Sequence, residues 1–319
     1  MLDNRIAPLR EAALVFVASA GGCMIAGRLI IPALIRAQRL APLRYGDCPP
    51  LLAYQQTKPQ VPTMGGLIVL GVAVAAALAA GAGGAWLVLV PTLGIGAIGL
   101  ADDLLKFRGP NGRGLRSLPK LLLSGVVAIA VGVVTAAPTA GMMANALWIL
   151  FVMLVIAGAS HAVNLTDGMD GLAVGCLAMA FAAFGVLTLL PGSAHPALAV
   201  WCASFSGACV GFLWFNSFPA SVFLGDVGAM GLGAALGTIG VVSGRPWWLA
   251  IVGGVFVAEA VSVMLQVGSY KWRNKKRVFR VAPLHHHVHL GGWPEPKVIA
   301  RFWIAGLLLA ALGLAQVAR

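Results

Sequence analysis

The chain has 319 residues, of which 60% are hydrophobic and only 10% are charged, and its mean hydropathy is +0.91. A soluble domain has about 25% charged residues and about half apolar ones, so a water-soluble globule, a disordered chain and a disulfide scaffold are excluded. Lys and Arg outnumber Asp and Glu by 22 to 10, a formal net charge of +12. We therefore expect an all-α, polytopic integral membrane protein that forms a single transmembrane domain over residues 1–319.

Ten apolar runs follow one another along the chain, each close to the roughly 20 residues that a membrane-crossing helix requires. Several runs are rich in Gly and Ala, such as residues 71–84 and 228–240, which favours close packing between helices. In chain order the ten predicted helices cover residues 12–35, 64–80, 85–101, 120–137, 142–160, 171–190, 196–215, 227–243, 247–268 and 298–317.

Basic residues gather in alternate loops between these runs. The loops after the first, third and ninth runs hold 16 of the 22 Lys and Arg residues, whereas the intervening loops on the other side hold only Arg245. The positive-inside rule therefore places the odd-numbered loops in the cytoplasm and both chain termini on the outside. Since these basic residues lie beside membrane helices, we expect them to meet anionic membrane lipids, and we expect no nucleic-acid partner.

Half of the ten acidic residues fall at the predicted cytoplasmic ends of the runs, beginning with the adjacent pair Asp102 and Asp103. Neighbouring carboxylates can bind a divalent cation or accept a proton, but they can also simply end a membrane span. Lys106 lies one turn further along, and the Gly-rich basic loop 108–116 follows. This combination favours the binding of phosphate.

A second polar motif covers residues 164–171, Asn-Leu-Thr-Asp-Gly-Met-Asp-Gly, with Asn164, Asp167 and Asp170 as its polar side chains. Alternating Asp and Gly is typical of a tight loop whose backbone can approach a ligand. Asn and Asp oxygens can bind a hard cation or accept hydrogen bonds from a sugar or a base. We expect this loop to contribute to a polar site.

A third motif ends at Asp226, which opens the eighth run. A carboxylate at a helix start can be a simple N-cap, and a helix start is also where an anion or a metal-bound phosphate would dock. Phe223, three residues earlier, is either a core or lipid-facing side chain or a platform for a nucleobase.

The fourth motif is the histidine cluster His285, His286, His287 and His289 in the last cytoplasmic loop. Clustered histidines can bind zinc, but adjacent histidines in one short segment point in diverging directions, so contacts to a pyrophosphate are favoured. Together the four motifs suit Mg²⁺, a soluble phosphorylated substrate and a lipid phosphate, because most of the ligands on offer are oxygens.

With these motifs in place, the chain resembles the polyprenyl-phosphate N-acetylhexosamine-1-phosphate transferases. The triple histidine resembles the members that transfer phospho-MurNAc-pentapeptide, not those that transfer N-acetylglucosamine phosphate. The matching stretches, in family order, are residues 62–66 (PTMGG), 102–106 (DDLLK), 164–172 (NLTDGMDGL), 223–226 (FLGD) and 282–303 (APLHHHVHLGGWPEPKVIARFW).

The resemblance implies a ten-helix enzyme, usually a homodimer, in the bacterial inner membrane with its active site facing the cytoplasm. Such an enzyme transfers phospho-MurNAc-pentapeptide from UDP-MurNAc-pentapeptide to undecaprenyl phosphate, forming lipid I and UMP in peptidoglycan biosynthesis. It requires Mg²⁺. A related transferase that uses another UDP-sugar such as UDP-GlcNAc remains an alternative, and so does an ion-coupled transporter, for which Glu259 inside the ninth run is the fitting acid.

The resemblance also implies roles for individual residues. Asp226 matches the principal Mg²⁺ ligand and Asn164 a weaker one, while Asp102 matches the residue that deprotonates the lipid phosphate and Asp103 its essential neighbour. The uridine-pocket positions are Lys58, Asp170, Asn216 and Phe223, and the positions around the sugar and phosphates are Thr63, Lys106, Lys120, Asp167, His285, His286 and His287.

Three stretches depart from the family pattern. His289 stands where family members commonly have Glu, and Val227-Gly228-Ala229 stands where they have Thr-Gly-Ser. Residues 45–60 also differ from the usual cytoplasmic sequence. We expect these differences to adjust the site without altering its carboxylates.

Overall fold

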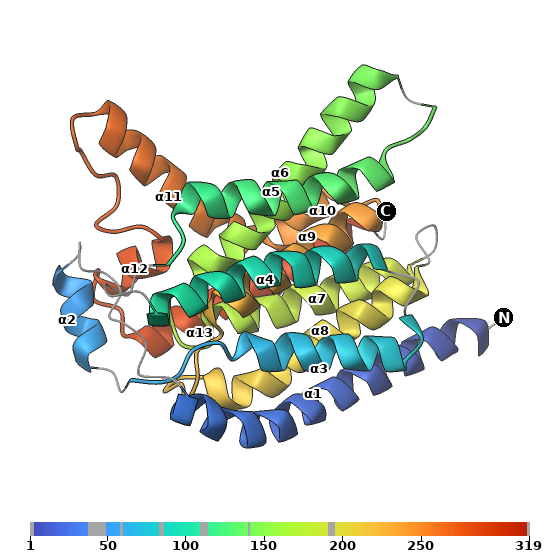
Figure 1. Cartoon of the computed structure of the whole chain (residues 1–319), viewed down its shortest axis with the longest axis horizontal. Helices are drawn as coiled ribbons and strands as arrows, with labels where there is room; N and C mark the ends of the chain where they lie inside the picture. Colours follow the sequence, from blue (N-terminus) through green and yellow to red (C-terminus); the bar gives the residue numbers. More distant parts are fainter. Residues whose placement is uncertain are drawn as a thin grey trace.

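The computed structural model describes residues 3–37, 49–57, 60–82, 86–108, 114–139, 141–190 and 195–317, and all regular secondary structure in this part of the chain is helical (Figure 1). In chain order the helices are α1 (Asp3–Ala37), α2 (Pro49–Thr57), α3 (Gly66–Ala79), α4 (Trp86–Arg108), α5 (Ser117–Thr135), α6 (Met142–Thr166), α7 (Leu172–Leu189), α8 (Pro196–Asn216), α9 (Gly225–Val242), α10 (Trp248–Val252), α11 (Gly254–Trp272), α12 (Leu284–His289) and α13 (Glu295–Val317).

Eight helices of this described part are long and apolar enough to cross a membrane, namely α1, α4, α5, α6, α7, α8, α9 and α13. The predicted all-α membrane fold is thus confirmed. The two remaining predicted crossings have a different form. Residues 64–80 give α3, which has only 14 helical residues, and residues 247–268 are divided at Gly253 into α10 and α11. Ten crossings stay a prediction.

Helix α9 lies at the centre of the bundle, with 94% of its span buried, and it packs along α4 and α6. Glycine makes this close packing possible. A Cβ on Gly228 would lie 2.6 Å from the Cα of Gly66 in α3, and a Cβ on Gly233 would lie 2.7 Å from the Ala159 carbonyl oxygen in α6. The packing predicted from the Gly and Ala content is confirmed, and it fixes where α9 begins.

The outer helices turn apolar side chains away from the bundle. Leu122 and Val126 of α5 are 60% and 65% exposed, and Leu154 of α6 is 66% exposed. Extended apolar faces of this kind would be unfavourable in water but suit contact with lipid.

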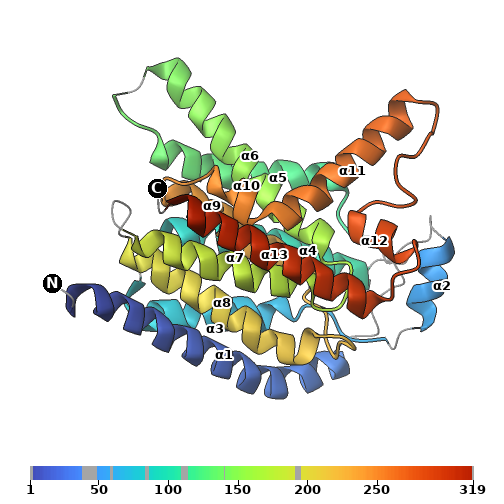
Figure 2. The same cartoon turned by 180° about the vertical axis from the view of Figure 1, so that it is seen from behind.

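Both ends of the described chain lie at the same end of the bundle, whereas α2, α12 and the start of α13 lie at the opposite end (Figures 1 and 2). This agrees with the prediction that both termini share one side of the membrane. Which side faces the cytoplasm stays a prediction. Helix α11 diverges from the bundle towards its C-terminal end, before the chain returns to α12 (Figure 2).

Two helices continue past the apolar runs that predicted them, and both extensions carry polar motifs. Helix α4 ends at Arg108 instead of residue 101, so Asp102 and Asp103 are helical. Helix α6 ends at Thr166 instead of residue 160, so Asn164 lies on a helix and not in the predicted loop. The backbone hydrogen bonds of a helix do not stop at the last apolar side chain, and the apolar run therefore underestimates the helix length.

Candidate active site

Three carboxylates meet where the C-terminal part of α4 contacts the start of α9. One oxygen each from Asp102, Asp103 and Asp226 lies within 4.8 Å of the others, and these residues are 1%, 0% and 3% exposed. Within the described residues, this is the only group of three or more Asp, Glu, His or Cys side chains placed to hold a metal ion. Buried like charges repel unless cations lie between them.

Two lysines supply that positive charge. Lys106 Nζ lies 2.5 Å from Asp102 Oδ2 and 2.9 Å from Asp226 Oδ1. Lys120, in the first turn of α5, places its Nζ 3.0 Å from Asp102 Oδ2 and 2.6 Å from Asp226 Oδ2. Each ammonium group thus bridges α4 and α9, and we define these five side chains as the carboxylate–lysine centre.

Backbone amides also bind carboxylate oxygens of this centre. The Leu115 N–H donates to Asp102 Oδ1 at 2.5 Å, and the Val227 N–H donates to Asp103 Oδ2 at 3.1 Å. Gly114 allows the first contact, because a Cβ there would lie 2.3 Å from Asp102 Oδ1. Asp102 and Asp103 are therefore held in place by main chain from two separate segments, the residues before α5 and the start of α9.

Two further predicted residues border this centre. The Asn164 side-chain amide donates to Asp226 Oδ2 at 3.4 Å. Thr63 is 4% exposed and lies beside Asp103, since a Cβ on Gly225 would meet the Thr63 hydroxyl at 2.6 Å and Asp103 Oδ2 at 2.8 Å. Gly225 has a φ of +76°, so this tight turn into α9 suits glycine on both counts.

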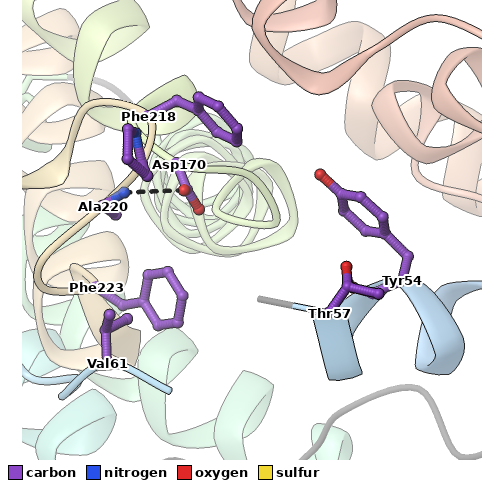
Figure 3. Close-up of a pocket in the computed structure, with 8 residues that line it drawn as sticks. Tyr54, Thr57, Val61, Asp170, Phe218, Ala220 and Phe223 are labelled. Atoms are coloured by element: carbon purple, nitrogen blue, oxygen red, sulfur yellow. Dashed lines mark hydrogen bonds between the residues drawn. The ribbon is translucent and has the colours of Figure 1, made fainter. Parts of the chain in front are cut away.

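A pocket of about 250 Å³ opens next to the centre. Phe223 lines one side of it and Tyr54 and Thr57 of α2 line the other (Figure 3). Phe223 is separated from Asp226 of the centre by only two residues, so the loop that lines the pocket leads directly into the centre. The complete lining is Tyr54, Thr57, Val61, Asp170, Phe218, Pro219, Ala220 and Phe223.

The predicted pocket residues Asp170 and Asn216 hold the loop before α9 in shape. Asp170 Oδ2 accepts a hydrogen bond from the Ala220 N–H at 3.0 Å (Figure 3). The Asn216 side chain donates to the Val222 carbonyl at 2.8 Å. Asp170 lines the pocket directly, whereas Asn216 acts on it through the loop that carries Phe223.

The histidine side chains of the cluster point in two different directions. His285 and His286 are 0% and 4% exposed, and a Cβ on Gly168 would lie 2.4 Å from His285 Nε2 and 3.1 Å from His286 Nε2. These two therefore lie against the turn that contains Asp167. His287 faces elsewhere, since its Nδ1 accepts the Arg280 N–H at 3.1 Å. Only part of the predicted triple-histidine site faces this turn.

Glu259 explains how His285 is held. This carboxylate is 0% exposed and accepts hydrogen bonds from the Leu284 and His285 N–H groups at 2.6 and 3.1 Å. It also lies 3.2 Å from His285 Nδ1. The acid that fitted a transporter is thus a structural partner of α12, through backbone amides and a histidine.

One residue that was predicted for the site lies outside the described part of the chain, and four residues near the site were not predicted. Lys58 lies outside the described residues. Tyr54, Glu259, Glu295 and His161 were not assigned to the site from the sequence. His161 lies one turn before Asn164 on α6, interacts electrostatically with Lys120 and Asp226, and its Nε2 is buried with no hydrogen-bond partner in the described part of the chain. His161 could have been found from the sequence, because a residue three positions before Asn164 lies on the same face of a helix. The predicted helix ended at residue 160, so this relationship was missed.

Buried acids bridged by lysines, with a pocket beside them at a helix start, define a membrane-embedded enzyme that handles phosphate groups. Comparison with known proteins gives the class. The profile of Glycosyl transferase family 4 matches residues 85–244, which include all five side chains of the carboxylate–lysine centre and Phe223.

Individual relatives narrow this class. The chain is 42% identical over 290 residues to the phospho-N-acetylmuramoyl-pentapeptide-transferase of Thermodesulfovibrio yellowstonii, with 81% of this chain and 80% of the relative covered. Proteins of the same name from Dichelobacter nodosus and Desulfotalea psychrophila are 44% and 43% identical over 288 and 291 residues, with the same coverage. The chain therefore belongs to the phospho-N-acetylmuramoyl-pentapeptide transferase family.

Proposed function

We propose that this protein transfers phospho-MurNAc-pentapeptide from UDP-MurNAc-pentapeptide to undecaprenyl phosphate, with release of UMP and formation of lipid I. The observation that carries the proposal is the buried carboxylate–lysine centre beside a pocket of about 250 Å³. The family membership favours this transfer over both the UDP-GlcNAc reaction and the transporter.

The reaction is an attack by an oxygen of the lipid phosphate on the β-phosphorus of the UDP-sugar. The bond from that phosphorus to the bridging oxygen breaks, and UMP leaves. In this proposal Asp102 takes the proton from the lipid phosphate. Its Oδ2 faces the two lysines, and its Oδ1 accepts the Leu115 N–H. Asp103 positions the start of α9 through the Val227 N–H.

Lys106 and Lys120 bind phosphate oxygens when the substrates enter. In the structure both ammonium groups lie between carboxylates at 2.5 to 3.0 Å, so they are already aimed at the place where negative charge arrives. Fixed ammonium groups of this kind stabilise the charge that develops on the transferred phosphoryl group. His285 and His286 of α12 add donors beside the turn that carries Asp167.

The donor set fits Mg²⁺. Three buried carboxylates within 4.8 Å of one another offer the hard oxygen ligands that Mg²⁺ prefers. Asp226 is the principal ligand in this proposal, and Asn164 is its neighbour. When bound, the ion would supply neutralisation of the pyrophosphate charge.

The pocket receives the uridine part of the substrate. Phe223 offers an aromatic face and Asp170 a carboxylate on the same lining, which suits stacking and hydrogen bonding to a planar heterocycle. Lys58, three residues before Val61 of the lining, belongs to this pocket in the proposal.

The proposed setting is the bacterial inner membrane, with the carboxylate–lysine centre facing the cytoplasm and the chain acting as one transmembrane catalytic domain. The concentration of Lys and Arg in the odd-numbered loops supports this orientation. We further propose a homodimer, which chemical cross-linking in native membranes would test.

The decisive experiment supplies the purified protein with undecaprenyl phosphate, Mg²⁺ and either UDP-MurNAc-pentapeptide or UDP-GlcNAc, and follows UMP release. We expect UMP from the muropeptide only, and only in the presence of a divalent cation. No release from the muropeptide would refute the proposal, and release from UDP-GlcNAc alone would assign the other sugar.

A further inference from the structure

Helix α2 lies apart from the bundle, next to α12 and the start of α13 (Figures 1 and 2). It nevertheless supplies two of the residues that line the pocket, Tyr54 and Thr57. A short helix outside the bundle needs a specific attachment to form a pocket wall, because its own backbone hydrogen bonds do not fix its position.

The attachment is a hydrogen bond from the Tyr54 hydroxyl to Glu295 Oε2. Glu295 opens α13 and is 1% exposed, so its carboxylate needs partners for both oxygens. The second oxygen, Oε1, accepts the Asp170 N–H at 3.0 Å. Tyr54 therefore joins α2 to the same buried acid that holds the turn carrying Asp170.

This chain of hydrogen bonds continues around the pocket. Asp170 accepts the Ala220 N–H at 3.0 Å, and Asp170 and Ala220 both line the pocket (Figure 3). The Tyr54 ring also packs against His289, with centroids 4.4 Å apart. Two of the three stretches that depart from the family pattern, residues 45–60 and His289, thus contact each other at this point.

We propose that Tyr54 is a positioning residue for the nucleotide: through Glu295 it holds α2 across the pocket, opposite Phe223, so that a bound uridine nucleotide is enclosed between the two. This rests on the function proposed above. Burial and the hydrogen bond to Glu295 raise the pKa of the Tyr54 hydroxyl, so it stays protonated and able to donate at neutral pH.

The test is Tyr54→Phe, which removes one oxygen and leaves the ring. We expect the KM for UDP-MurNAc-pentapeptide to rise about tenfold, a change typical of one lost hydrogen bond to a charged group. The kcat and the KM for undecaprenyl phosphate should stay within about twofold, because the hydroxyl acts on the pocket wall through Glu295. Tyr270→Phe on α11 removes the same atom outside the pocket and should change neither KM.

A structural readout accompanies the kinetics. UMP should slow amide hydrogen exchange in residues 49–57 of the wild-type protein, and the protection should be much weaker in Tyr54→Phe. An unchanged nucleotide KM, an equal rise in both KM values, or equal protection of residues 49–57 in the two proteins would overturn the proposal.

These experiments also distinguish the proposed function from the proposed role of Tyr54. If the wild type turns over the muropeptide and Tyr54→Phe has the same nucleotide KM as the wild type, only the role of Tyr54 is refuted. Absence of turnover, combined with UMP binding that weakens about tenfold in Tyr54→Phe by calorimetry, refutes only the assigned reaction.

Discussion

Lys106 Nζ lies 2.9 Å from Asp226 Oδ1, although 120 residues separate these two residues in the chain. The ammonium group joins α4 to α9 at the point where both helices are buried. With Lys120 alongside, three carboxylates face two ammonium groups, which leaves one excess negative charge. A centre of that charge attracts a cation and, with a divalent ion bound, becomes net positive and suited to phosphate.

Replacement of Asp226 by Asn tests the main ligand. We expect kcat to fall by about 10³-fold or more, because the neutral amide loses the charge that attracts both lysines and the metal ion. The variant should remain folded, since Asn keeps the shape of the side chain. Glu11→Gln, at an exposed position on α1, is the matched control and should retain full activity. UMP release and thermal unfolding in detergent measure the two effects, and near-normal turnover in Asp226→Asn would refute its role.

Replacement of Lys106 by Met separates metal binding from catalysis. The ammonium group competes with a divalent cation for Asp102 and Asp226, from which it lies 2.5 and 2.9 Å. Its removal should tighten Mn²⁺ binding by about tenfold or more, since a unit charge at such distances contributes several kcal/mol at the effective dielectric of a protein. Turnover should nevertheless fall at least about 100-fold, because a phosphate-binding group is lost. Electron paramagnetic resonance of bound Mn²⁺ measures the affinity, and weaker Mn²⁺ binding would contradict this electrostatic interpretation.

Gly99→Ala tests whether close packing of α4 on α9 positions the centre. The added Cβ would lie 2.3 Å from the Asp226 carbonyl oxygen, which is main chain and cannot rotate away. We expect a loss of about 1–3 kcal/mol in stability. In α3, Gly71 has open space around its Cβ position, so Gly71→Ala should be neutral or should stabilise by about 0.5–1 kcal/mol. Thermal unfolding of both variants in the same detergent measures the two changes in stability. Equal changes in Gly99→Ala and Gly71→Ala would show that the contact at Gly99 is not tight.

Much of the fold followed from the apolar runs, because crossing the bilayer dictates helix length and composition. Residues 64–80 and 247–268 were the exceptions. The first gives a helix of only 14 residues, and the second is divided at Gly253. Hydropathy averages over a run and does not detect where backbone hydrogen bonding stops.

The site was predictable where its residues were chemically unusual for a membrane. Asp102, Asp103 and Asp226 stood out because a buried carboxylate is costly there, and the structure brings them together. Glu259 was singled out only as the acid that would suit a transporter, and Glu295 was assigned no role; their partners are backbone N–H groups, one histidine and one tyrosine. Such partners depend on the tertiary arrangement and leave no pattern in the sequence. His287 does diverge from His285, as the sequence predicted for adjacent histidines in one short segment.

Glu259→Ala measures the contribution of the acid that holds α12. Its loss leaves the Leu284 and His285 N–H groups without their acceptor in a buried place. We expect stability to fall by about 2–4 kcal/mol and turnover to drop, because unsatisfied buried donors are costly and His285 loses its support. Glu259→Gln keeps one acceptor oxygen and should recover part of the stability. Thermal unfolding and UMP release are the measurements, and an alanine variant as stable as the wild type would contradict the structural role.

The Tyr54 hydroxyl predicts a pH dependence with a definite sign. Burial, followed by the hydrogen bond to Glu295, raises its pKa above the ordinary value of 10.0. A raised pKa means that the folded protein retains the proton, so the stabilisation is fully present below pH 10.0 and is lost only as the pH passes through the raised value. The ratio of nucleotide KM values between Tyr54→Phe and wild type should therefore stay constant from roughly pH 7 to 9.5.

In a spectrophotometric titration up to about pH 11, both proteins should form the same number of phenolate groups. An extra phenolate in the wild type, or a KM ratio that falls towards one below pH 9.5, would show that Tyr54 is exposed and not bonded to Glu295.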